Sequence, residues 1–419
     1  MNRLIVVGAG PAGLSLALQL VRAGQAVTLI EANAGFARQF RGDALMPCGL
    51  EALARMGLWQ LLEALPQRPL EGWSVWLERR PLFHVAEPMG SLQPCRLVPQ
   101  GLLLEALLQE AQRHPGLRWL PGQAVRGLLE DNGRVQGVEL ADGQRLEADL
   151  VVACDGRGSA LRQAAGLELR RSGQGLELLW FTLPAADGIG PDQEDPAVPG
   201  FMTLLAGGAI GSACRGARGE LQLAWLLERG VPPPRRSPEQ WAAALAQLAP
   251  EPLAQRLRQG AAQLSAPLRV SVQVGLAPRW CRPGLLLLGD AAHPMSPVRA
   301  QGINMALRDS LVAAQELLAA QGPAQLDAAA QRVQRRRLPE IRRMQALQSA
   351  EARQGALLGH SALLRQAALV ASPLAGPLAA QLWRRRQGPL REGLADALPV
   401  VPNFDTITPC GGSTSAPLS

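Results

Sequence analysis

Residues 4–31 read LIVVGAGPAGLSLALQLVRAGQAVTLIE, and this stretch decides the fold. A β-branched run over residues 2–7 leads into a glycine-rich turn, and helical periodicity follows over residues 12–23. A second strand-like run over residues 26–31 ends in an acid. Strand, turn, helix and strand within about 30 residues predict a Rossmann βαβ unit that binds a dinucleotide.

The turn has the pattern Gly-x-Gly-x-x-Gly, and each of the three positions requires glycine for a different physical reason. Gly8 permits the tight turn, Gly10 lets the backbone approach a pyrophosphate, and Gly13 lets helix and strand pack closely. The anion then lies at the positive end of the helix dipole. Glu31 ends the second strand, where it can accept hydrogen bonds from ribose hydroxyls. The predicted cofactor-binding residues of this unit are Gly8, Gly10, Ala12, Gly13 and Glu31.

Two later segments favour FAD over NAD. Residues 151–162 read VVACDGRGSALR, and residues 285–309 read LLLLGDAAHPMSPVRAQGINMALRD. Each is an apolar strand that runs into a turn with an aspartate, and the second turn leads to a new helix N-terminus. An extended FAD needs such a second cradle, whereas a bound NAD does not. The predicted cofactor-binding residues here are Asp155, Gly156, Gly289, Asp290, Gly302, Ile303 and Asn304.

The composition excludes several kinds of chemistry. The chain has 419 residues and a formal charge of +7, and all 42 of its basic residues are arginine. It contains no lysine and no tyrosine, so a Schiff-base lysine and a tyrosine general acid are unavailable. The six cysteines form no CxxC pair and the histidines show no ligand spacing, so we expect no metal site. The arginines are dispersed, which argues against nucleic-acid binding.

The sequence pattern changes at about residue 173. From there to about residue 275, strand-like runs alternate with Gly/Pro-rich connections, which predicts a second domain. The predicted fold class is α/β, with a Rossmann-type FAD-binding domain, an inserted substrate domain on a mostly antiparallel sheet, and C-terminal helices. The expected boundaries are 1–72, 94–172 and 270–322 for the FAD-binding domain, 73–93 and 173–269 for the substrate domain, 323–398 for the C-terminal helical region, and 399–419 for a disordered tail.

In this order, the three segments resemble the glycine-rich, DG and GD motifs of the single-component flavoprotein aromatic hydroxylases, the group of para-hydroxybenzoate hydroxylase and the ubiquinone-pathway hydroxylases. The resemblance covers roughly residues 1–345 and includes Arg41-Gly42-Asp43 and the segment from Arg96 to Gln100. It implies that Asp155 serves both FAD and NAD(P)H, that Asp290 holds the ribityl chain, and that Pro297 lines the flavin. Further FAD contacts that we expect are Arg41, Arg96, Gln100 and Val125.

The resemblance also implies an activity. NAD(P)H would reduce the FAD, and a flavin hydroperoxide would hydroxylate or epoxidise an aromatic, quinone-like or other apolar electron-rich small molecule. Candidate pocket residues are Trp180, Met202, Leu204 and Trp225. The alternative is a flavin-dependent reductase of the geranylgeranyl-reductase type, although its tyrosine-containing substrate motif is missing. A halogenase would need a lysine, and a flavin-binding sensor would leave the second domain without a role.

One loop departs from the family pattern. Where the family usually has Pro-Pro-x-Gly-Gly, this chain has Ser296, Pro297, Val298, Arg299 and Ala300. We name Pro297 and Arg299 as candidate catalytic residues of the flavin environment. The arginine replaces a glycine that lets the flavin ring move, so it puts that movement in question. It could instead place a positive charge beside the reduced flavin, bind an acidic substrate, or point into solvent.

The remaining expectations concern location and partners. Arginine clusters such as 335–337 and 384–386 flank apolar helices in the C-terminal region. They are expected to be solvated faces, with peripheral docking to an anionic membrane surface as the alternative. No stretch reads as a clean membrane span or signal peptide, so a cytoplasmic protein is expected, as a monomer or a homodimer. We expect His293 to be structural rather than a general base.

Overall fold

The first βαβ unit forms as expected in the computed structural model, which describes residues 2–36, 43–90, 93–171, 175–186, 188, 190, 193–227, 231–394 and 398. It consists of β1 (Leu4–Val7), α1 (Pro11–Arg22) and β2 (Val27–Glu31). All four residues of β1 are buried, because a parallel strand inside an α/β sheet is covered on both faces. Pro11 begins α1, where its missing N–H costs nothing.

Six described strands form one sheet around this unit, in the order β20-β21-β12-β1-β2-β8. The additional strands are β8 (Leu117–Pro121), β12 (Leu150–Ala153), β20 (Cys281–Arg282) and β21 (Leu285–Leu287). The strand pairs β1–β2, β1–β12, β2–β8 and β12–β21 are parallel, so their carboxyl ends meet at one edge. That edge carries the glycine turn, the Asp155 turn and the Asp290 turn together.

Helices cover the sheet, and a separate small sheet packs beside it. Helix α1 packs against α4 (Gln100–Gln112) and α8 (Gln301–Leu318). Strands β9 (Val125–Asp131) and β10 (Arg134–Leu140) of the small sheet form a hairpin whose turn contains Asn132 and Gly133, both with positive φ. The shorter elements of this half are β3 (Ala44–Leu45), α2 (Pro47–Arg55), α3 (Trp59–Glu63), β4 (Arg68–Pro69), β7 (Arg96–Leu97), β11 (Arg145–Glu147), α5 (Ala160–Ala164), β13 (Arg170–Arg171), β19 (Gly275–Leu276), η2 (Gly289–Ala291) and η3 (Val298–Ala300).

A second sheet of seven described strands has the order β18-β14-β17-β16-β15-β5-β6. Its strands are β5 (Gly72–Leu77), β6 (Arg80–Ala86), β14 (Leu176–Leu183), β15 (Phe201–Ala206), β16 (Ala209–Arg215), β17 (Leu221–Leu227) and β18 (Leu268–Val272). Only β5 and β15 pair in parallel in this sheet. The expected α/β class with an inserted, mostly antiparallel sheet is therefore confirmed; the exact domain boundaries stay a prediction.

One face of the second sheet packs against two helices. These are α6 (Pro238–Leu248) and α7 (Glu251–Gln259), followed by the short η1 (Ala261–Gln263). The rings of Phe181 and Trp241 lie 5.2 Å apart between sheet and helix. Pro250 separates the two helices. The opposite face of the sheet is turned toward the first domain.

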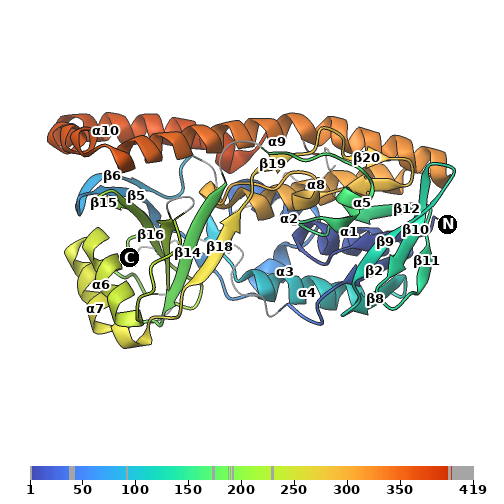
Figure 1. Ribbon diagram of the computed structural model, residues 1–419, viewed down its shortest axis with the longest axis horizontal. Coiled ribbons are helices and arrows are strands. Elements are labelled where there is room, and N and C mark those ends of the chain that lie inside the picture. The colour runs from blue at the N-terminus through green and yellow to red at the C-terminus, as the bar shows by residue number, and fades with distance from the viewer. Residues whose placement is uncertain are drawn as a thin grey trace, which may run out of the picture.

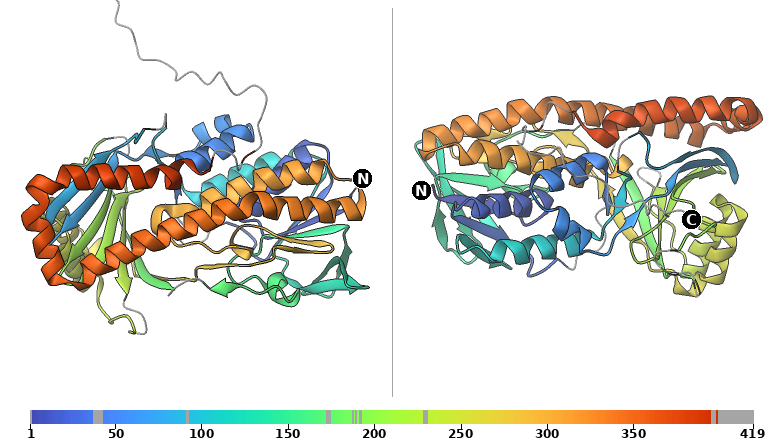
Figure 2. Two further views of the ribbon diagram at one scale, coloured as in Figure 1. Left: turned by 90° about the horizontal axis from the view of Figure 1, so that it is seen from above. Right: turned by 180° about the vertical axis from the view of Figure 1, so that it is seen from behind.

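Two long helices run along the whole molecule. Helix α9 (Gly322–His360) packs on α8, and α10 (Ala362–Glu392) packs against β6 of the second sheet (Figure 1). Figure 2 shows, from above, that the two helices form a bent strap that joins the halves. Within the described residues no single helix passes as a membrane span by length and composition, although the bent pair Ala362–Pro373 and Ala375–Glu392 does so jointly. The expected tail, residues 399–419, lies outside the described residues.

Candidate active site

A cavity of about 2570 Å³ lies between the two sheets. Its walls come from the glycine turn, the carboxyl ends of β2 and β12, the inner face of the second sheet, and the start of α8. The C-terminal part of α9, from Gln348 to His360, and Trp383 of α10 also line it. Segments that are distant in the chain therefore surround one space, as the three glycine-containing motifs predict.

The three glycines of the first turn behave differently. At Gly8, φ is +99°, and an added Cβ would come within 2.4 Å of the Cys154 carbonyl oxygen. At Gly13, an added Cβ would lie 1.9 Å from the Gly8 carbonyl oxygen, so this glycine allows the helix to touch the turn. At Gly10, an added Cβ would meet no described atom within 4 Å, and the residue lines the cavity. This geometry leaves room for a pyrophosphate beside Gly10.

Glu31 is buried at the end of β2 and borders the cavity. One carboxylate oxygen accepts a 2.8 Å hydrogen bond from the Ala9 amide, and the other accepts bonds from Asn33. The glutamate thus holds the glycine turn while it faces the space where a ribose is expected. Ala12 and Val125 line the same part of the cavity.

Two further aspartates face the cavity from different strands. Oδ2 of Asp155 accepts a 3.1 Å bond from the Leu161 amide, whereas its buried Oδ1 has no hydrogen-bond partner among the residues that the structure describes. Asp290 forms a 3.0 Å ion pair with Arg157. A buried carboxylate oxygen without a partner is costly unless a ligand satisfies it. A hydroxyl-bearing ligand such as FAD fits this orphaned atom.

The N-terminus of α8 also opens into the cavity. Ala300 precedes the helix and has no polar side chain to cap it, while Gly302 and Ile303 line the cavity. The first amides of a helix are unsatisfied donors and carry positive potential, so they attract an anion. Together with Gly10 and Asp155, this helix end fits a long cofactor with several negative and hydroxyl groups, as FAD is.

Gln100 lines the cavity at the start of α4. Its amide donates a 3.2 Å bond to Asp43, and the other oxygen of Asp43 accepts a 3.0 Å bond from Gln222 of the second sheet. Burial raises the pKa of Asp43 above its ordinary value, and these two bonds only partly offset that effect. Asp43 thus joins the two halves of the molecule at the cavity wall.

Several predicted FAD contacts do not line the cavity. Gly13 and Gly289 serve packing and turns, whereas the buried Asn304 binds the backbone of Met46 and Ala300. Arg96 pairs with Glu63 at 2.6 Å and stacks over Trp59, with 4.9 Å from its guanidinium carbon to the ring centroid. Arg41 lies outside the described residues. FAD contact by Gly156 and Asp290, which do line the cavity, stays a prediction.

A buried charge network supports the Gly289–Asp290 turn. Asp309 of α8 accepts a 3.3 Å bond from the Gly289 amide and a 2.6 Å bond from His293, whose ring packs on Trp280. Its other oxygen pairs with Arg337 of α9 at 2.7 Å. His293 is therefore structural, as expected.

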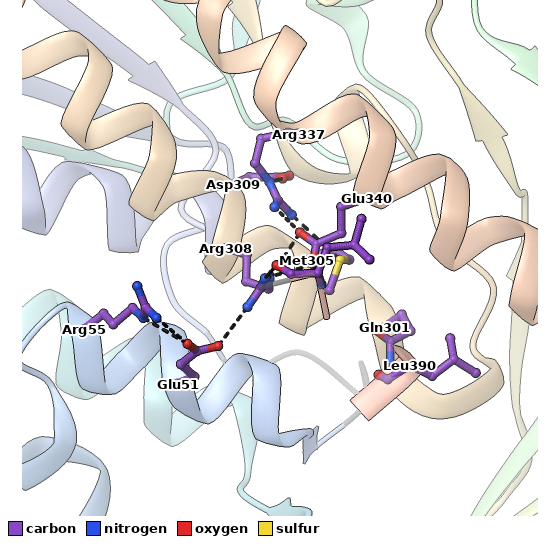
Figure 3. A network of polar contacts seen from close by, with 10 residues as sticks. Glu51, Arg55, Gln301, Met305, Arg308, Asp309, Arg337, Glu340 and Leu390 are labelled. Carbon is purple, nitrogen blue, oxygen red and sulfur yellow. Dashed lines mark hydrogen bonds and ion pairs between the residues drawn. The ribbon is translucent and has the colours of Figure 1, made fainter. Parts of the chain in front are cut away.

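The network continues along the two helices (Figure 3). Arg337 pairs with Glu340, which in turn pairs with Arg308 at 2.9 Å, and Arg308 reaches Glu51 of α2 at 3.1 Å. Arg308, Asp309, Arg337 and Glu340 are fully buried. Two buried arginines and two buried carboxylates balance one another, which is the condition for burying charge at tolerable cost.

The second sheet presents one row of side chains to the cavity. Trp180 pairs with Ala224, Ala224 with Ser212, and Ser212 with Thr203, so these residues share a face, and all of them line the cavity. Further members of this face are Trp73, Val75, Leu178, Phe201, Leu205 and Leu226. The surface is mainly apolar, and the hydroxyl and amide groups on it come from Thr203, Ser212 and Gln222.

Two of the predicted pocket residues lie on the other face. Met202 and Leu204 are fully buried against α6 and do not line the cavity, so their assignment to the pocket was wrong. Successive residues of a strand point to opposite faces, and the cavity face takes Phe201, Thr203 and Leu205 instead. Trp180 is correctly placed at the cavity. Trp225 also lines it, although its ring packs edge-on against Trp241 at 5.9 Å.

Arg299 does not point into solvent. Only 8% of its side chain is exposed, and it pairs with Glu351 of α9, with 2.8 Å between its Nε and the carboxylate. Its guanidinium carbon lies 4.6 Å from the ring centroid of Trp73 and 4.7 Å from that of Trp383. Pro297 and Arg299 both line the cavity. The charge that the sequence suggested for a flavin or an acidic substrate is already paired with Glu351.

The site also contains residues that the sequence did not reveal. Gln348, Glu351 and His360 of α9, Trp383 of α10 and Trp73 of β5 line the cavity. No motif marks them, because α9 and α10 read as amphipathic helices with arginine-rich faces. The expected C-terminal helical region is thus a wall of the active site.

Comparison with known families settles the class of this site. The profile of the FAD-binding domain family matches residues 2–344. The chain belongs to this family. This FAD-binding protein is 34% identical to 6-methylpretetramide 4-monooxygenase of Streptomyces rimosus, over 74% of its own length and 73% of that enzyme. It is 27% identical to 3-demethoxyubiquinol 3-hydroxylase of Escherichia coli, over 74% and 77% of the two chains.

Solved structures of the same fold agree. The crystal structure of PqsL of Pseudomonas aeruginosa in complex with 2-aminobenzoylacetate aligns with a TM-score of 0.70 at 20% identity, over 83% of this chain and 95% of that one. A mutant of 2-methyl-3-hydroxypyridine-5-carboxylic acid oxygenase aligns with a TM-score of 0.71 at 23% identity, over 89% and 96%. The family match and the relatives establish an FAD-dependent monooxygenase, so the expected enzyme class is confirmed.

Proposed function

We propose that this FAD-dependent monooxygenase uses NAD(P)H and oxygen to hydroxylate an aromatic, quinone-like or other apolar electron-rich small molecule. The observation that carries the proposal is the pairing of two unlike surfaces in one cavity. A polar cradle of Gly10, Glu31, Asp155 and the α8 N-terminus faces an apolar sheet surface that includes Trp180. Ligand sites of this kind bury apolar ligands and orient them with a few polar groups.

Bound FAD supplies the redox chemistry with oxygen, and the protein supplies position, electrostatics and a water-poor space. The α8 N-terminus, at Gly302 and Ile303, stabilises negative charge on the cofactor. Pro297 fixes the backbone on the substrate side of that helix end. The apolar residues of the second sheet limit the access of water to the reacting atoms.

The sheet surface also supports a statement about substrate class. The row Trp180, Ala224, Ser212 and Thr203 offers an aromatic face and two hydroxyl groups. Arg299, in the loop that precedes α8, is neutralised by Glu351. An uncharged ring-bearing compound with hydroxyl or carbonyl groups fits this surface. The Streptomyces rimosus relative, which is named for a 6-methylpretetramide substrate, supports a compound with more than one ring.

Labelled oxygen tests the proposal. The purified FAD-loaded protein is incubated with NADH or NADPH, ¹⁸O₂ and a panel of phenols, quinone precursors and polycyclic aromatics. We expect one ¹⁸O atom in the product and oxygen consumption equal to the product formed. If the substrate turns over under strict anaerobiosis and no label enters the product when ¹⁸O₂ is supplied, the protein is a reductase and the proposal is overturned.

We also propose that the α9–α10 strap makes peripheral contact with an anionic lipid surface. Leu363 is 85% exposed and Val370 is 81% exposed, and Leu357 is 62% exposed. Three exposed arginines, Arg384 to Arg386, lie farther along the same strap. Exposed apolar side chains and a basic cluster on one helical segment are features of helices that lie on a membrane.

Vesicle sedimentation tests the lipid contact. The full chain should sediment with vesicles that contain about 30% phosphatidylserine and not with pure phosphatidylcholine, because the arginines attract anionic headgroups within a Debye length. Replacing Leu363 and Val370 by serine should abolish sedimentation while the FAD absorbance stays unchanged. The lipid contact would be contradicted if equal amounts of protein sedimented with both vesicle types. It would also be contradicted if light scattering without vesicles showed a dimer that depends on the strap.

A further inference from the structure

The loop that precedes α8 is held by one face of α9. This loop, residues 294–301, is called the flavin loop below. Nε2 of Gln348 donates to the carbonyls of Ser296 and Val298 at 2.9 and 2.6 Å, and Gln345 reaches the Pro294 carbonyl at 3.4 Å. Glu351 pairs with Arg299. Residues 345, 348 and 351 are spaced three apart, so they form a row on one face of the helix.

Helix α10 holds the same loop from the other side. Gln301 donates a 2.6 Å bond to the Leu390 carbonyl, and Gln387 donates a 3.1 Å bond to Glu351. The Arg299 guanidinium lies over the ring of Trp383. The flavin loop therefore has polar partners on both helices of the strap, and Arg299 contacts both.

Arg299 also joins the strap to the second sheet. Trp73 belongs to β5, and its ring centroid lies 4.6 Å from the Arg299 guanidinium carbon, 6.2 Å from the ring of Trp383 and 5.2 Å from the ring of Phe201 on the cavity face. A guanidinium beside two aromatic rings gains cation–π attraction from both, especially when it is shielded from water. Trp73, Arg299 and Trp383 thus form a continuous layer from the sheet to α10.

The backbone shows that these contacts outweigh a local cost. Arg299 has φ 58° and ψ 28°, and Ala300 has φ 48° and ψ 35°. Left-handed conformations are unfavourable for residues with a Cβ and persist where the surroundings impose them. The ion pair with Glu351 and the two tryptophans are such surroundings. Although burial opposes ionisation of Glu351, Arg299 holds its pKa below the ordinary value, so the pair is charged at neutral pH.

We propose that Arg299 is a positioning residue that locks the α9–α10 strap onto the flavin loop. Because Arg299 contacts both Trp73 and Trp383 and pairs with Glu351, the wall of the substrate cavity and the N-terminus of α8 are held as one unit. The arginine acts through its neighbours, because its charge is satisfied by Glu351 rather than presented to the substrate. This inference rests on the proposed function only for its effect on turnover.

Hydrogen exchange of the apoprotein tests the lock without turnover. Arg299→Gly removes the side chain at a position whose φ suits glycine, so the backbone is not strained further. We expect roughly tenfold faster exchange in two distant segments, residues 296–301 and 380–392, because a shielded ion pair and two ring contacts are lost. Glu351→Gln should accelerate the same two segments, and the double variant should exchange no faster than Arg299→Gly.

Two further variants sharpen the comparison. Arg299→Lys keeps the charge but loses the planar stack, so we expect intermediate exchange in both segments. Arg343 is an exposed residue of α9, the helix that carries Glu351. Arg343→Gln is therefore the matched control and should exchange like the wild type. Wild-type rates in both segments for Arg299→Gly, acceleration of 296–301 alone, or equal acceleration throughout the protein would each overturn the lock.

The turnover arm uses the FAD-loaded enzyme and measures product formed per oxygen consumed. Loosening the wall admits water, so we expect this ratio to fall about threefold or more in Arg299→Gly, with partial rescue in Arg299→Lys and little change in KM for NAD(P)H. An unchanged ratio would overturn the proposal. If even the wild type forms no hydroxylated product, the proposed function fails, and the exchange measurements still decide whether the lock exists.

Discussion

A methyl group added at each glycine of the first turn meets a different obstacle. At Gly13 the obstacle is the protein itself, since the Cβ would lie 1.9 Å from the Gly8 carbonyl. At Gly10 an added Cβ meets no described atom within 4 Å, and the residue lines the cavity, so we expect the obstacle there to be bound FAD. One residue type in one motif is therefore expected to serve folding at one position and binding at the other.

Gly10→Ala should weaken FAD binding at least tenfold while the unfolding free energy of the apoprotein stays within about 0.5 kcal/mol of wild type. Gly13→Ala should destabilise the apoprotein by roughly 1–3 kcal/mol, because helix and turn must separate. Urea unfolding of the apoprotein and fluorescence titration with FAD measure the two quantities. Equal destabilisation by both variants would contradict the distinction.

In strand β15, neighbouring residues point to opposite faces of the sheet. Met202→Ala should cost about 2–5 kcal/mol of stability, because it empties a packed position against α6. Thr203→Phe should instead fill the substrate cavity and raise the KM for the substrate, with little change in unfolding. Steady-state kinetics and urea unfolding on both variants provide the comparison; the reverse pattern would show that the register assignment fails.

At the scale of elements, the charge network joins α2, α8 and α9 and adds polar contacts to the apolar core that the three helices share. Burial raises the pKa of Asp309 and of Glu340, yet the charges on His293 and Arg337, and on Arg337 and Arg308 respectively, outweigh it and hold both pKa values below the ordinary ones. Carboxylates with a lowered folded-state pKa stabilise the protein above their unfolded pKa. That stabilisation is lost as the pH falls through the folded value.

Glu340→Gln should therefore do two things. It should destabilise the protein at pH 7 by about 3–5 kcal/mol, since it leaves Arg308 and Arg337 buried with a lost partner. It should also flatten the dependence of stability on pH below the ordinary Glu value of 4.5, since one linked proton is removed. Urea unfolding at several pH values between 3 and 7 measures both effects. A variant with wild-type acid sensitivity would contradict this assignment.

At the scale of the whole molecule, the sequence predicted the first sheet, the cofactor and the inserted sheet, because each has a local signature of period and turn residues. It did not predict which face of β15 meets the cavity. Both faces are apolar, one against α6 and one against a ligand space, so alternation alone leaves Met202 and Thr203 equivalent. The partners of Arg299 were also hidden, since Glu351 and Trp383 lie 52 and 84 residues away with no motif.

The reactivity of the buried cysteines reports on how well the folded molecule shields them. Burial raises the pKa of Cys48 to about 12 and that of Cys154 well above its ordinary value, so both react slowly at neutral pH. Cys154 also lines the cavity beside Gly8. Removing FAD should accelerate alkylation of Cys154 and leave that of Cys48 unchanged, as measured by peptide mass spectrometry. Equal acceleration at both thiols would indicate general loosening instead.

The order in which the glycine turn and the strap follow along the chain has a consequence for biosynthesis. A polypeptide leaves the ribosome from its N-terminus, so the glycine turn at residues 8–13 emerges more than 330 residues before Gln348 and Glu351. Until that last wall has emerged, the nascent nucleotide site lacks the groups that hold the flavin loop. We therefore expect stable cofactor capture to follow translation, and we expect a stalled or prematurely terminated chain to expose an apolar, incomplete cleft to proteases and chaperones.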